Sequence, residues 1–279
     1  MRNTIALLLM ACIIGCQSRS EPTKAAKNKE HDHNSHDHRG SEHKHSETGH
    51  GAHEAKSGLT LRIVPLQLVS GESTKLKLMV HDSQNKMLKD FEPTHEKLVH
   101  LIIIDKGMSQ FAHLHPEVAV DGSMTVAHAF PQGGEYYVYA DIKPKGQSPE
   151  TVRETITVKG EPGSSASLQN TVPGVVNGEG WSAKVTVSAA KPGESAVSFV
   201  FKNGDKVLSD LEPYLGAMGH LVVVNTKDGE YAHSHPDEKQ TPGTVRFMVH
   251  FAKPGVYKGW GQFKRSNKVF DVPFVVHVN

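Results

Sequence analysis

The most constraining feature of this sequence is an internal repeat. Residues 80–116 align without gaps on residues 200–236, and 12 of the 37 positions are identical. The match continues beyond this segment, where Phe130 corresponds to Phe251. Because a duplicated sequence folds into a duplicated structure, we expect two copies of one domain, each of roughly 100 residues.

Each copy has the pattern of short β-strands. In the first copy, residues 59–66, 73–82 and 135–142 alternate apolar and polar side chains, and no segment keeps a 3.6-residue period with helix caps. About seven such strands, separated by Gly, Pro, Asn and Asp turns, are typical of an antiparallel sandwich. The sequence therefore predicts an all-β protein: two tandem Ig-like or cupredoxin-like antiparallel β-sandwich repeats after a disordered histidine-rich tail.

The N-terminus has the pattern of an export signal. Arg2 precedes an apolar core that is too short to cross a membrane as a stable helix. The core ends in Ile-Ile-Gly-Cys, residues 13–16, which resembles the lipobox of bacterial lipoproteins. The resemblance implies that Cys16 is lipidated and anchors the protein to a membrane of the bacterial cell envelope, facing the periplasm or the exterior. The alternative is an ordinary secretory signal with a chance cysteine.

Cysteine usage and net charge exclude several functions. Cys12 would leave with the signal and Cys16 would be acylated, so the mature protein would hold no free thiol and no disulfide. Thiolate zinc sites, iron–sulfur clusters and blue-copper sites are excluded on that basis. The formal net charge is +1 with no basic cluster, so we expect no nucleic-acid partner.

A histidine-rich segment follows the cysteine. Residues 30–54 contain eight histidines among acids, Ser and Gly, and they contain no large apolar residue that could support a core. A flexible chain with dense imidazoles binds Zn or Cu without a preformed geometry. The alternative is a solvated spacer whose histidines are incidental. The candidate metal ligands of the tail are His31, His33, His36, His38, His43, His45, His50 and His53.

These features divide the chain into five parts. The expected bounds are 1–15 for a lipoprotein signal peptide, 16–58 for the disordered tether, 59–159 for the first sandwich, 160–174 for a linker of small residues and proline, and 175–279 for the second sandwich.

A histidine triad with H-x12-H-x-H spacing occurs once in each repeat. Two histidines that are two residues apart on a strand share a face, and a third on a neighbouring strand completes a set of ligands suited to Zn or Cu(II). The alternative is that the imidazoles form hydrogen bonds that hold a β-corner. The triads are His100, His113 and His115 in the first repeat and His220, His233 and His235 in the second.

Two further side chains are candidate ligands in the second repeat. Met218 lies two residues before His220 and is a possible soft copper ligand, or else core filler. His250 lies on a later strand, as does His128 in the first repeat, but the two are offset by one residue relative to the aligned phenylalanines. A one-residue offset changes the face, so at most one of them should join its triad. These features rank the second repeat as the leading site.

The surroundings of the second triad resemble a known family. The segments LEPYLGAMGHLVVV, GEYAHSHP and PGVYKGWGQF are similar to those of a family of poorly characterised bacterial secreted proteins and lipoproteins. The repeats also resemble YtkA-like and copper-resistance-type Ig-like sandwich domains. The resemblance implies an envelope location and heavy-metal handling without an established reaction. The first repeat lacks the YLGAxGH segment.

Three classes of function fit these features. The leading hypothesis is a membrane-anchored extracytoplasmic lipoprotein that captures, buffers or delivers Zn or Cu, with a metal efflux or uptake system as partner. The alternative is a non-catalytic envelope scaffold or interaction module with structural histidines. A metalloenzyme would need a general base, for which Glu117 and Asp237 are the candidates. We expect no enzyme, because the sequence has no nucleophile elbow, phosphate loop or dinucleotide fingerprint.

Overall fold

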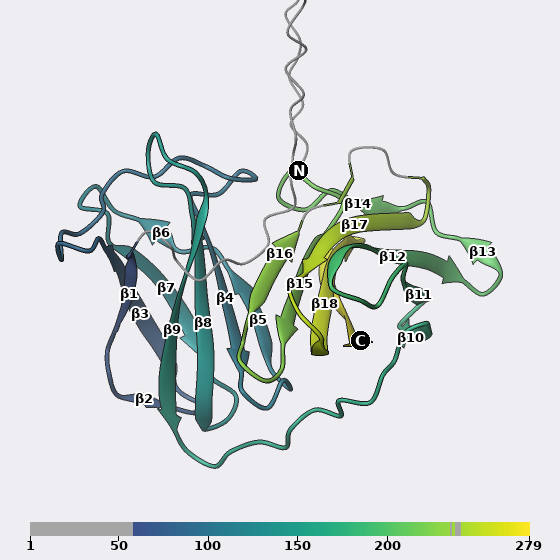
Figure 1. Ribbon diagram of the computed structural model, residues 1–279, viewed down its shortest axis with the longest axis horizontal. Coiled ribbons are helices and arrows are strands. Elements are labelled where there is room, and N and C mark those ends of the chain that lie inside the picture. The colour runs from purple at the N-terminus through teal and green to yellow at the C-terminus, as the bar shows by residue number, and fades with distance from the viewer. Residues whose placement is uncertain (1–57, 235, 238–240) are drawn as a thin grey trace, which may run out of the picture. The chain divides into compact units, whose positions relative to one another are not determined.

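The computed structural model describes residues 58–234, 236–237 and 241–279. Over these residues the chain consists of β-strands and connecting turns and contains no helix, which confirms the all-β prediction (Figure 1). The described part accordingly offers no helix of the length and hydropathy needed to cross a bilayer. The predicted signal peptide, Cys16 and the eight tail histidines lie outside the described residues.

The first repeat is a sandwich of two sheets. One sheet has the strand order β1-β3-β7-β6 and the other β2-β9-β8-β4-β5. The repeat has more than the expected seven strands because β2 and β6 have two residues each, too few for an alternating pattern to reveal. The strands are β1 (Thr60–Val64), β2 (Leu68–Val69), β3 (Ser73–His81), β4 (Val99–Asp105), β5 (Phe111–Leu114), β6 (Glu117–Val118), β7 (Met124–Ala129), β8 (Gly134–Ile142) and β9 (Glu150–Lys159).

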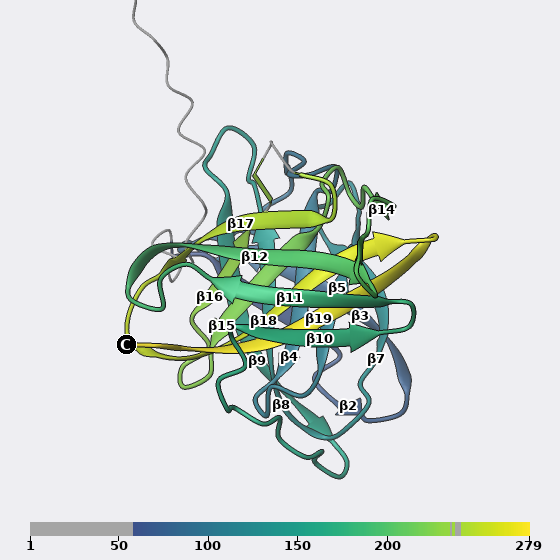
Figure 2. The same cartoon turned by 90° about the vertical axis from the view of Figure 1, so that its right-hand side faces the viewer.

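The second repeat has the same two-layer design. One sheet has the order β10-β11-β12-β13 with β17 paired to β12, and the other has the order β14-β18-β15-β16 with β19 paired to β18. Figure 2 shows the first of these sheets lying in front of the second. The strands are β10 (Gly174–Gly178), β11 (Trp181–Val187), β12 (Gly193–Asn203), β13 (Lys206–Val207), β14 (Leu211–Glu212), β15 (His220–Asn225), β16 (Tyr231–Ser234), β17 (Thr244–Phe251), β18 (Gly255–Arg265) and β19 (Lys268–Val278).

Each sandwich has its own apolar core between its two sheets. In the first, alternate residues of β3 point inward, and Leu76, Leu78 and Val80 are fully buried. In the second, phenylalanines dominate, with Phe199 packed edge-to-face on Phe263 at 5.0 Å between ring centroids. Each repeat therefore has a core of its own. Burying a side chain of this size contributes about 1.5–3 kcal/mol to stability.

A third apolar cluster lies between the two sandwiches. Tyr139 of the first repeat stacks on Tyr231 of the second with ring centroids 4.4 Å apart, and Phe111 stacks on Trp260 at 5.1 Å. The two sandwiches belong to one compact unit of the chain. The buried residues of this inter-repeat cluster are Ile102, Ile104, Met108, Tyr137, Tyr139, Val222, Val224, Tyr231 and Trp260.

The inter-repeat cluster explains why β4 and β15 are buried along their whole length. Successive side chains of a strand point to opposite faces. In β4, Leu101 and Ile103 face the core of the first sandwich, whereas Ile102 packs against the second repeat. β15 follows the same rule, so the two central strands meet across the interface with their outer faces.

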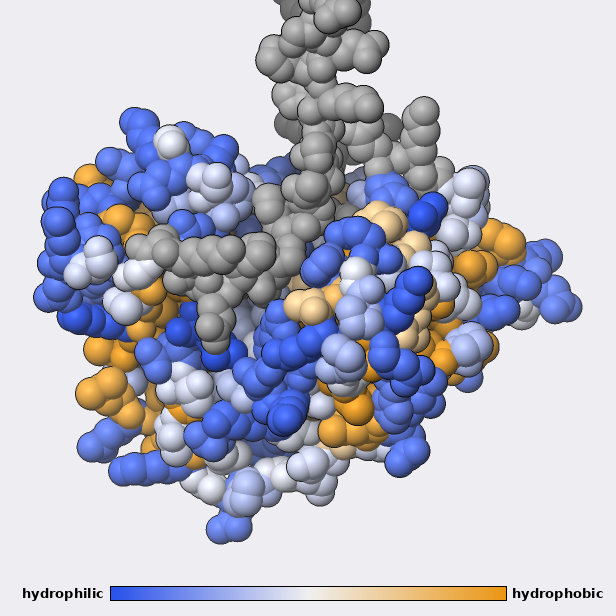
Figure 3. All heavy atoms as spheres, viewed as in Figure 1, coloured by the Kyte–Doolittle hydropathy of each residue, from blue (hydrophilic) through white to orange (hydrophobic). Residues whose placement is uncertain are grey.

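Polar side chains dominate the surface of the face drawn in Figure 3, where apolar residues are scattered among them. The most exposed large apolar side chains among the described residues are Leu66 and Val120, both in loops of the first repeat. Single exposed apolar residues are normal on protein surfaces.

Candidate metal centre

The two predicted triads converge on one place between the repeats. Ring centroids of the five described triad histidines lie between 4.7 and 6.1 Å from one another in eight pairs. The sequence was interpreted as two separate sites with the second repeat ranked first, whereas the structure joins both triads. We call this set the histidine cluster: His100, His113, His115, His220 and His233. His235 lies outside the described residues.

Strand register places these side chains on the outer faces of the sheets. The third histidine of the triad was expected on a neighbouring strand, and β4, which carries His100, pairs with β5, with Ile102 opposite His113. His100 lies two residues before Ile102 and therefore shares its face. In the second repeat Val222 lies opposite His233, so the same register is repeated. The cluster occupies the end of the interface where β4 and β15 begin.

Two equivalent tight turns fix the rings of the first histidine in each repeat. Nε2 of His100 lies 2.9 Å from the carbonyl oxygen of Thr94, and Nε2 of His220 lies 2.9 Å from that of Tyr214. A carbonyl oxygen only accepts, so Nε2 donates its proton and Nδ1 carries the lone pair in the neutral ring. The turns match although their sequences differ, Thr-His-Glu-Lys against Tyr-Leu-Gly-Ala.

The second histidine of each triad is oriented by the opposite repeat. Nδ1 of His113 donates to Oε1 of Gln262 at 3.0 Å, and Nε2 of Gln262 donates to Asp271 at 3.0 Å, which fixes the amide orientation. Nδ1 of His233 donates to Oδ2 of Asp141 at 2.8 Å. A carboxylate behind a histidine is the usual outer contact of a metal-bound imidazole, because it fixes the tautomer and raises ligand basicity.

These contacts direct acceptor nitrogens at one another. Nδ1 of His100 and Nε2 of His113 lie 3.0 Å apart, and each is the nitrogen that its outer contact leaves without a proton. The two lone pairs repel each other at this distance. A cation that binds both nitrogens turns this repulsion into an attraction. A separation of 3.0 Å lets both nitrogens contact one ion at the Zn–N distance of about 2.0–2.1 Å. His233 adds a third ligand atom, since those of His100, His113 and His233 all lie within 4.8 Å of one another.

Burial keeps the imidazoles in the neutral form that binds metals. Desolvation lowers the pKa of His220 to about 4 and that of His115 to about 3. It also lowers the pKa of His113 and His233 well below the usual value, and neighbouring imidazoles add to the effect. The cluster is therefore a set of neutral nitrogen donors at neutral pH.

Two of the predicted ligands lie elsewhere. His250 is exposed on β17, in the other sheet of the second repeat, where Nδ1 lies 3.2 Å from Glu194, so its assignment to the metal site is corrected. The one-residue offset predicts that at most one of His128 and His250 joins its triad. His128 packs edge-on against Phe130. Met218 packs against the apolar core of the second repeat, as the core-filler alternative had it.

Several residues of the site were missed in the sequence. Asp141 and Gln262 occupy equivalent positions opposite His100 and His220 on the neighbouring strands. Tyr231 donates from its hydroxyl to Oδ2 of Asp141 at 2.7 Å, which leaves that carboxylate bound to two groups of the opposite repeat. A comparison of the repeats at these positions was the available clue, because both carry a polar residue there.

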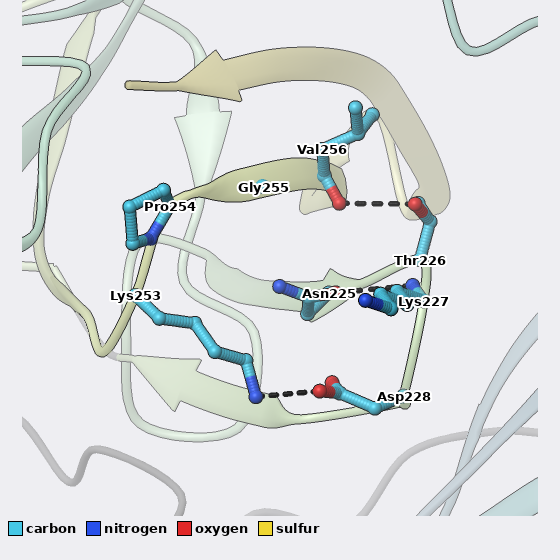
Figure 4. A pocket seen from close by; sticks show the side chains of 8 residues that line it. All are labelled: Asn225, Thr226, Lys227, Asp228, Lys253, Pro254, Gly255 and Val256. Carbon is cyan, nitrogen blue, oxygen red and sulfur yellow. Dashed lines mark hydrogen bonds and ion pairs between the residues drawn. The ribbon is translucent and has the colours of Figure 1, made fainter.

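A pocket at the other end of β15 is a weaker candidate (Figure 4). Its walls are residues 225–228 and 253–256, and an ion pair between Asp228 and Lys253 lies across it. The side chains drawn there do not converge on a common point. The histidine cluster is therefore the candidate site of this fold.

The fold and the cluster define a class: a double β-sandwich whose repeats share one group of histidines. Within that class the chain belongs to the family described as "Domain of unknown function (DUF8832)", which matches residues 54–160 and 175–279. The double match confirms the internal repeat. The resemblance to YtkA-like and copper-resistance-type sandwiches stays a prediction. No curated protein matches the chain.

Solved structures with similar strands include adhesin and fibronectin-type modules. The adhesin FdeC of Escherichia coli is 14% identical over 80% of this chain, which spans 64% of that protein, with a TM-score of 0.27. A two-domain fibronectin type III segment of chicken tenascin is 12% identical over 78% of this chain and 97% of its own, with a TM-score of 0.24. A DUF4785 family protein from Legionella pneumophila is 13% identical over 79% of this chain and 55% of its own, with a TM-score of 0.27. Scores this low carry no functional argument.

Proposed function

We propose that this protein is a non-catalytic, membrane-anchored extracytoplasmic lipoprotein that binds Zn or Cu at the histidine cluster. The observation that carries the proposal is the 3.0 Å separation of Nδ1 of His100 and Nε2 of His113, two acceptor nitrogens aimed at each other. Their outer contacts come from groups whose hydrogen-bonding role is fixed. A bound cation is the simplest partner for both atoms.

The donor set favours a borderline divalent ion. The described ligand atoms of the cluster are all imidazole nitrogens, which suit Zn and Cu(II) better than Mg or Ca. Met218, the soft ligand that would favour Cu(I), is half-buried and packs against the apolar core of the second repeat. Zn²⁺ and Cu²⁺ are therefore the ions to test first.

A catalytic role is not part of the proposal. The two candidate general bases are Glu117, exposed on the β6 edge of the other sheet of the first repeat, and Asp237, which pairs with Arg246 at 3.5 Å. Neither is tied by a described contact to the histidine cluster. Capture, buffering or delivery of the ion to an efflux or uptake system needs no such base.

The N-terminal sequence supports the cellular setting of the proposal. A lipobox-like segment ending at Cys16 would anchor the chain to an envelope membrane, and the eight tail histidines would gather ions near the folded part. Binding by the tail and by the histidine cluster are separate properties. An experiment must therefore measure the cluster without the tail histidines.

A second function has an observation in its favour. The hydrogen bonds of His113 to Gln262 and of His233 to Asp141 join the repeats directly. The same imidazoles could serve as structural links in an envelope scaffold or interaction module. Such links would stabilise the fold equally with and without metal, which separates the two functions.

Calorimetry with a matched pair of proteins tests the proposal. The full chain with its eight tail histidines changed to asparagine is titrated with Zn²⁺ and with Cu²⁺, and a second protein adds His100→Ala and His113→Ala. We expect one bound ion per chain in the first protein and none in the second. Absence of binding in the first protein leaves the scaffold function in its place.

A further inference from the structure

We propose that His95 and His115 form the access route by which the ion reaches the buried part of the histidine cluster. The inference rests on the proposed function and assigns a role to two imidazoles that differ from the others in exposure. His95 was not a candidate in the sequence, because it stands outside the repeated spacing. It acts as the first ligand that an incoming ion meets, and His115 acts as the second.

Exposure decreases stepwise from His95 to the centre. His95 is exposed, His115 is half-buried, and His100 is only 2% exposed. The ring centroid of His100 lies 6.5 Å from that of His95 and 5.0 Å from that of His115. An ion can therefore exchange its waters for imidazoles one at a time, without crossing apolar surface as a bare charge.

The opposite side of the histidine cluster is closed. His100 is followed on its face of β4 by Ile102 and Ile104, which are fully buried, and Tyr231 and Trp260 close the same region from the second repeat. The turn at residues 94–97 lies at the start of β4 and carries His95 at its tip. His95 therefore lies at the exposed end of the interface between the repeats.

His115 has a nitrogen available for a passing ion. Its Nε2 is buried and has no hydrogen-bond partner among the described residues. His115 is the residue directly after β5, and its ring centroid lies 4.7 Å from that of His113. A buried polar atom without a partner lowers the stability of the fold, and a transient bond to a metal ion would satisfy this nitrogen.

The backbone at His95 is held in a conformation that side chains rarely adopt. His95 and Glu96 have φ of 49° and 66°, in the left-handed region, whereas the equivalent turn uses Leu215 and Gly216. Glycine is the usual residue there, so Glu96 holds a backbone conformation that a residue with a side chain disfavours. Glu96 lies beside Gly216 of the second repeat, where an added Cβ would approach it to 3.2 Å.

Stopped-flow exchange with a chromophoric chelator tests the inference. The full chain lacking the tail histidines is compared with the same chain carrying His95→Asn, for both Zn²⁺ and Cu²⁺. We expect association and dissociation rates to fall together by at least about tenfold, because a tethered ligand raises the effective concentration of an ion by orders of magnitude. The equilibrium constant should change less than threefold. His115→Asn should slow both rates in the same way.

The control is His250→Asn, which removes an exposed histidine paired with Glu194 outside the histidine cluster. Its rates should match those of the starting chain. Unchanged rates in His95→Asn overturn the access route, and a weaker equilibrium constant with an unchanged association rate shows a resident ligand instead. If the starting chain binds neither ion, the proposed function itself fails, and the access route fails with it.

Discussion

His113 of the first repeat donates a hydrogen bond from Nδ1 to Oε1 of Gln262 in the second repeat, 149 residues further along the chain. The reciprocal contact joins His233 of the second repeat to Asp141 of the first at 2.8 Å. Each repeat thus orients an imidazole that belongs to the other. A single repeat cannot assemble the histidine cluster, and this explains why the triads occur in one chain with both sandwiches in contact.

Replacement of Asp141 should weaken metal binding without dismantling the fold. Asp141→Asn keeps the size of the side chain but removes the negative charge behind His233. Loss of such an outer carboxylate typically lowers metal affinity by about 10–100-fold, because the imidazole becomes a weaker donor. Competition titration with a chelator of known affinity measures the change.

Asp121→Asn is the matched control for this variant. Asp121 is an exposed carboxylate in the same repeat, bonded to Ser123 rather than to any histidine. The Asp121→Asn protein should bind the metal with the affinity of the starting protein. Equal affinity in all three proteins would show that the Asp141 carboxylate does not act on a metal ligand.

Removal of a ligand should lower stability more when metal is present than when it is absent. A ligand that binds the folded state alone stabilises it by about 2.7 kcal/mol at one hundred times its Kd. His113→Ala should lose this metal-induced rise in melting temperature. The metal-free protein should lose less, since the variant also removes one of two facing acceptor nitrogens. Thermal melts with Zn²⁺ and with EDTA measure both terms, and an equal loss in the two conditions would favour the structural role.

Much of the single-repeat structure could be predicted from sequence. Alternating residues 73–82 form β3, and the expected placement of His100 on a strand next to that of His113 is met by the pairing of β4 with β5. These features depend on local periodicity and on short connections, which a sequence displays directly. The shared face of His113 and His100 follows from the same register.

The joining of the two triads could not be predicted in this way. It depends on how two sandwiches dock, and the contacts that build it, such as Tyr231 to Asp141, join residues 90 positions apart. One clue was present in the continuous apolar runs Leu-Ile-Ile-Ile and Leu-Val-Val-Val that follow His100 and His220. A strand with one face in water alternates, so an unbroken apolar run indicates burial on both faces. Applied here, that rule would have predicted a covered outer face.

Stability of the metal-free protein should fall as the pH decreases from about 6.5 to about 4. Burial lowers the pKa of His220 from near 6.5 to about 4. Between these values the unfolded chain binds a proton that the folded chain does not, so acid favours unfolding. This one group contributes about 1.4 kcal/mol per pH unit in that window.

Urea unfolding in EDTA at a series of pH values measures this dependence. His220→Gln should give a flatter profile because it removes one of the groups that take up a proton on unfolding. Identical slopes for the starting protein and His220→Gln would contradict the pKa assignment of His220.

Two adjacent isoleucines separate interface packing from core packing. Ile102 and Ile103 are both essentially buried, but Ile102 faces the second repeat and lies opposite His113, whereas Ile103 faces the core of the first sandwich. Either Ile→Ala change should lower the free energy of unfolding by about 2–5 kcal/mol, since both remove the same buried atoms.

Only Ile102→Ala should also weaken metal binding. A cavity beside His113 loosens the docking of the two repeats, and the ligands of the histidine cluster come from both. Ile103→Ala leaves that face intact and should keep the affinity of the starting protein despite its lower stability. Measuring the affinity well below the melting temperature of both variants separates the effects, and equal losses of affinity would mean that global stability, not the fit between the repeats, controls the site.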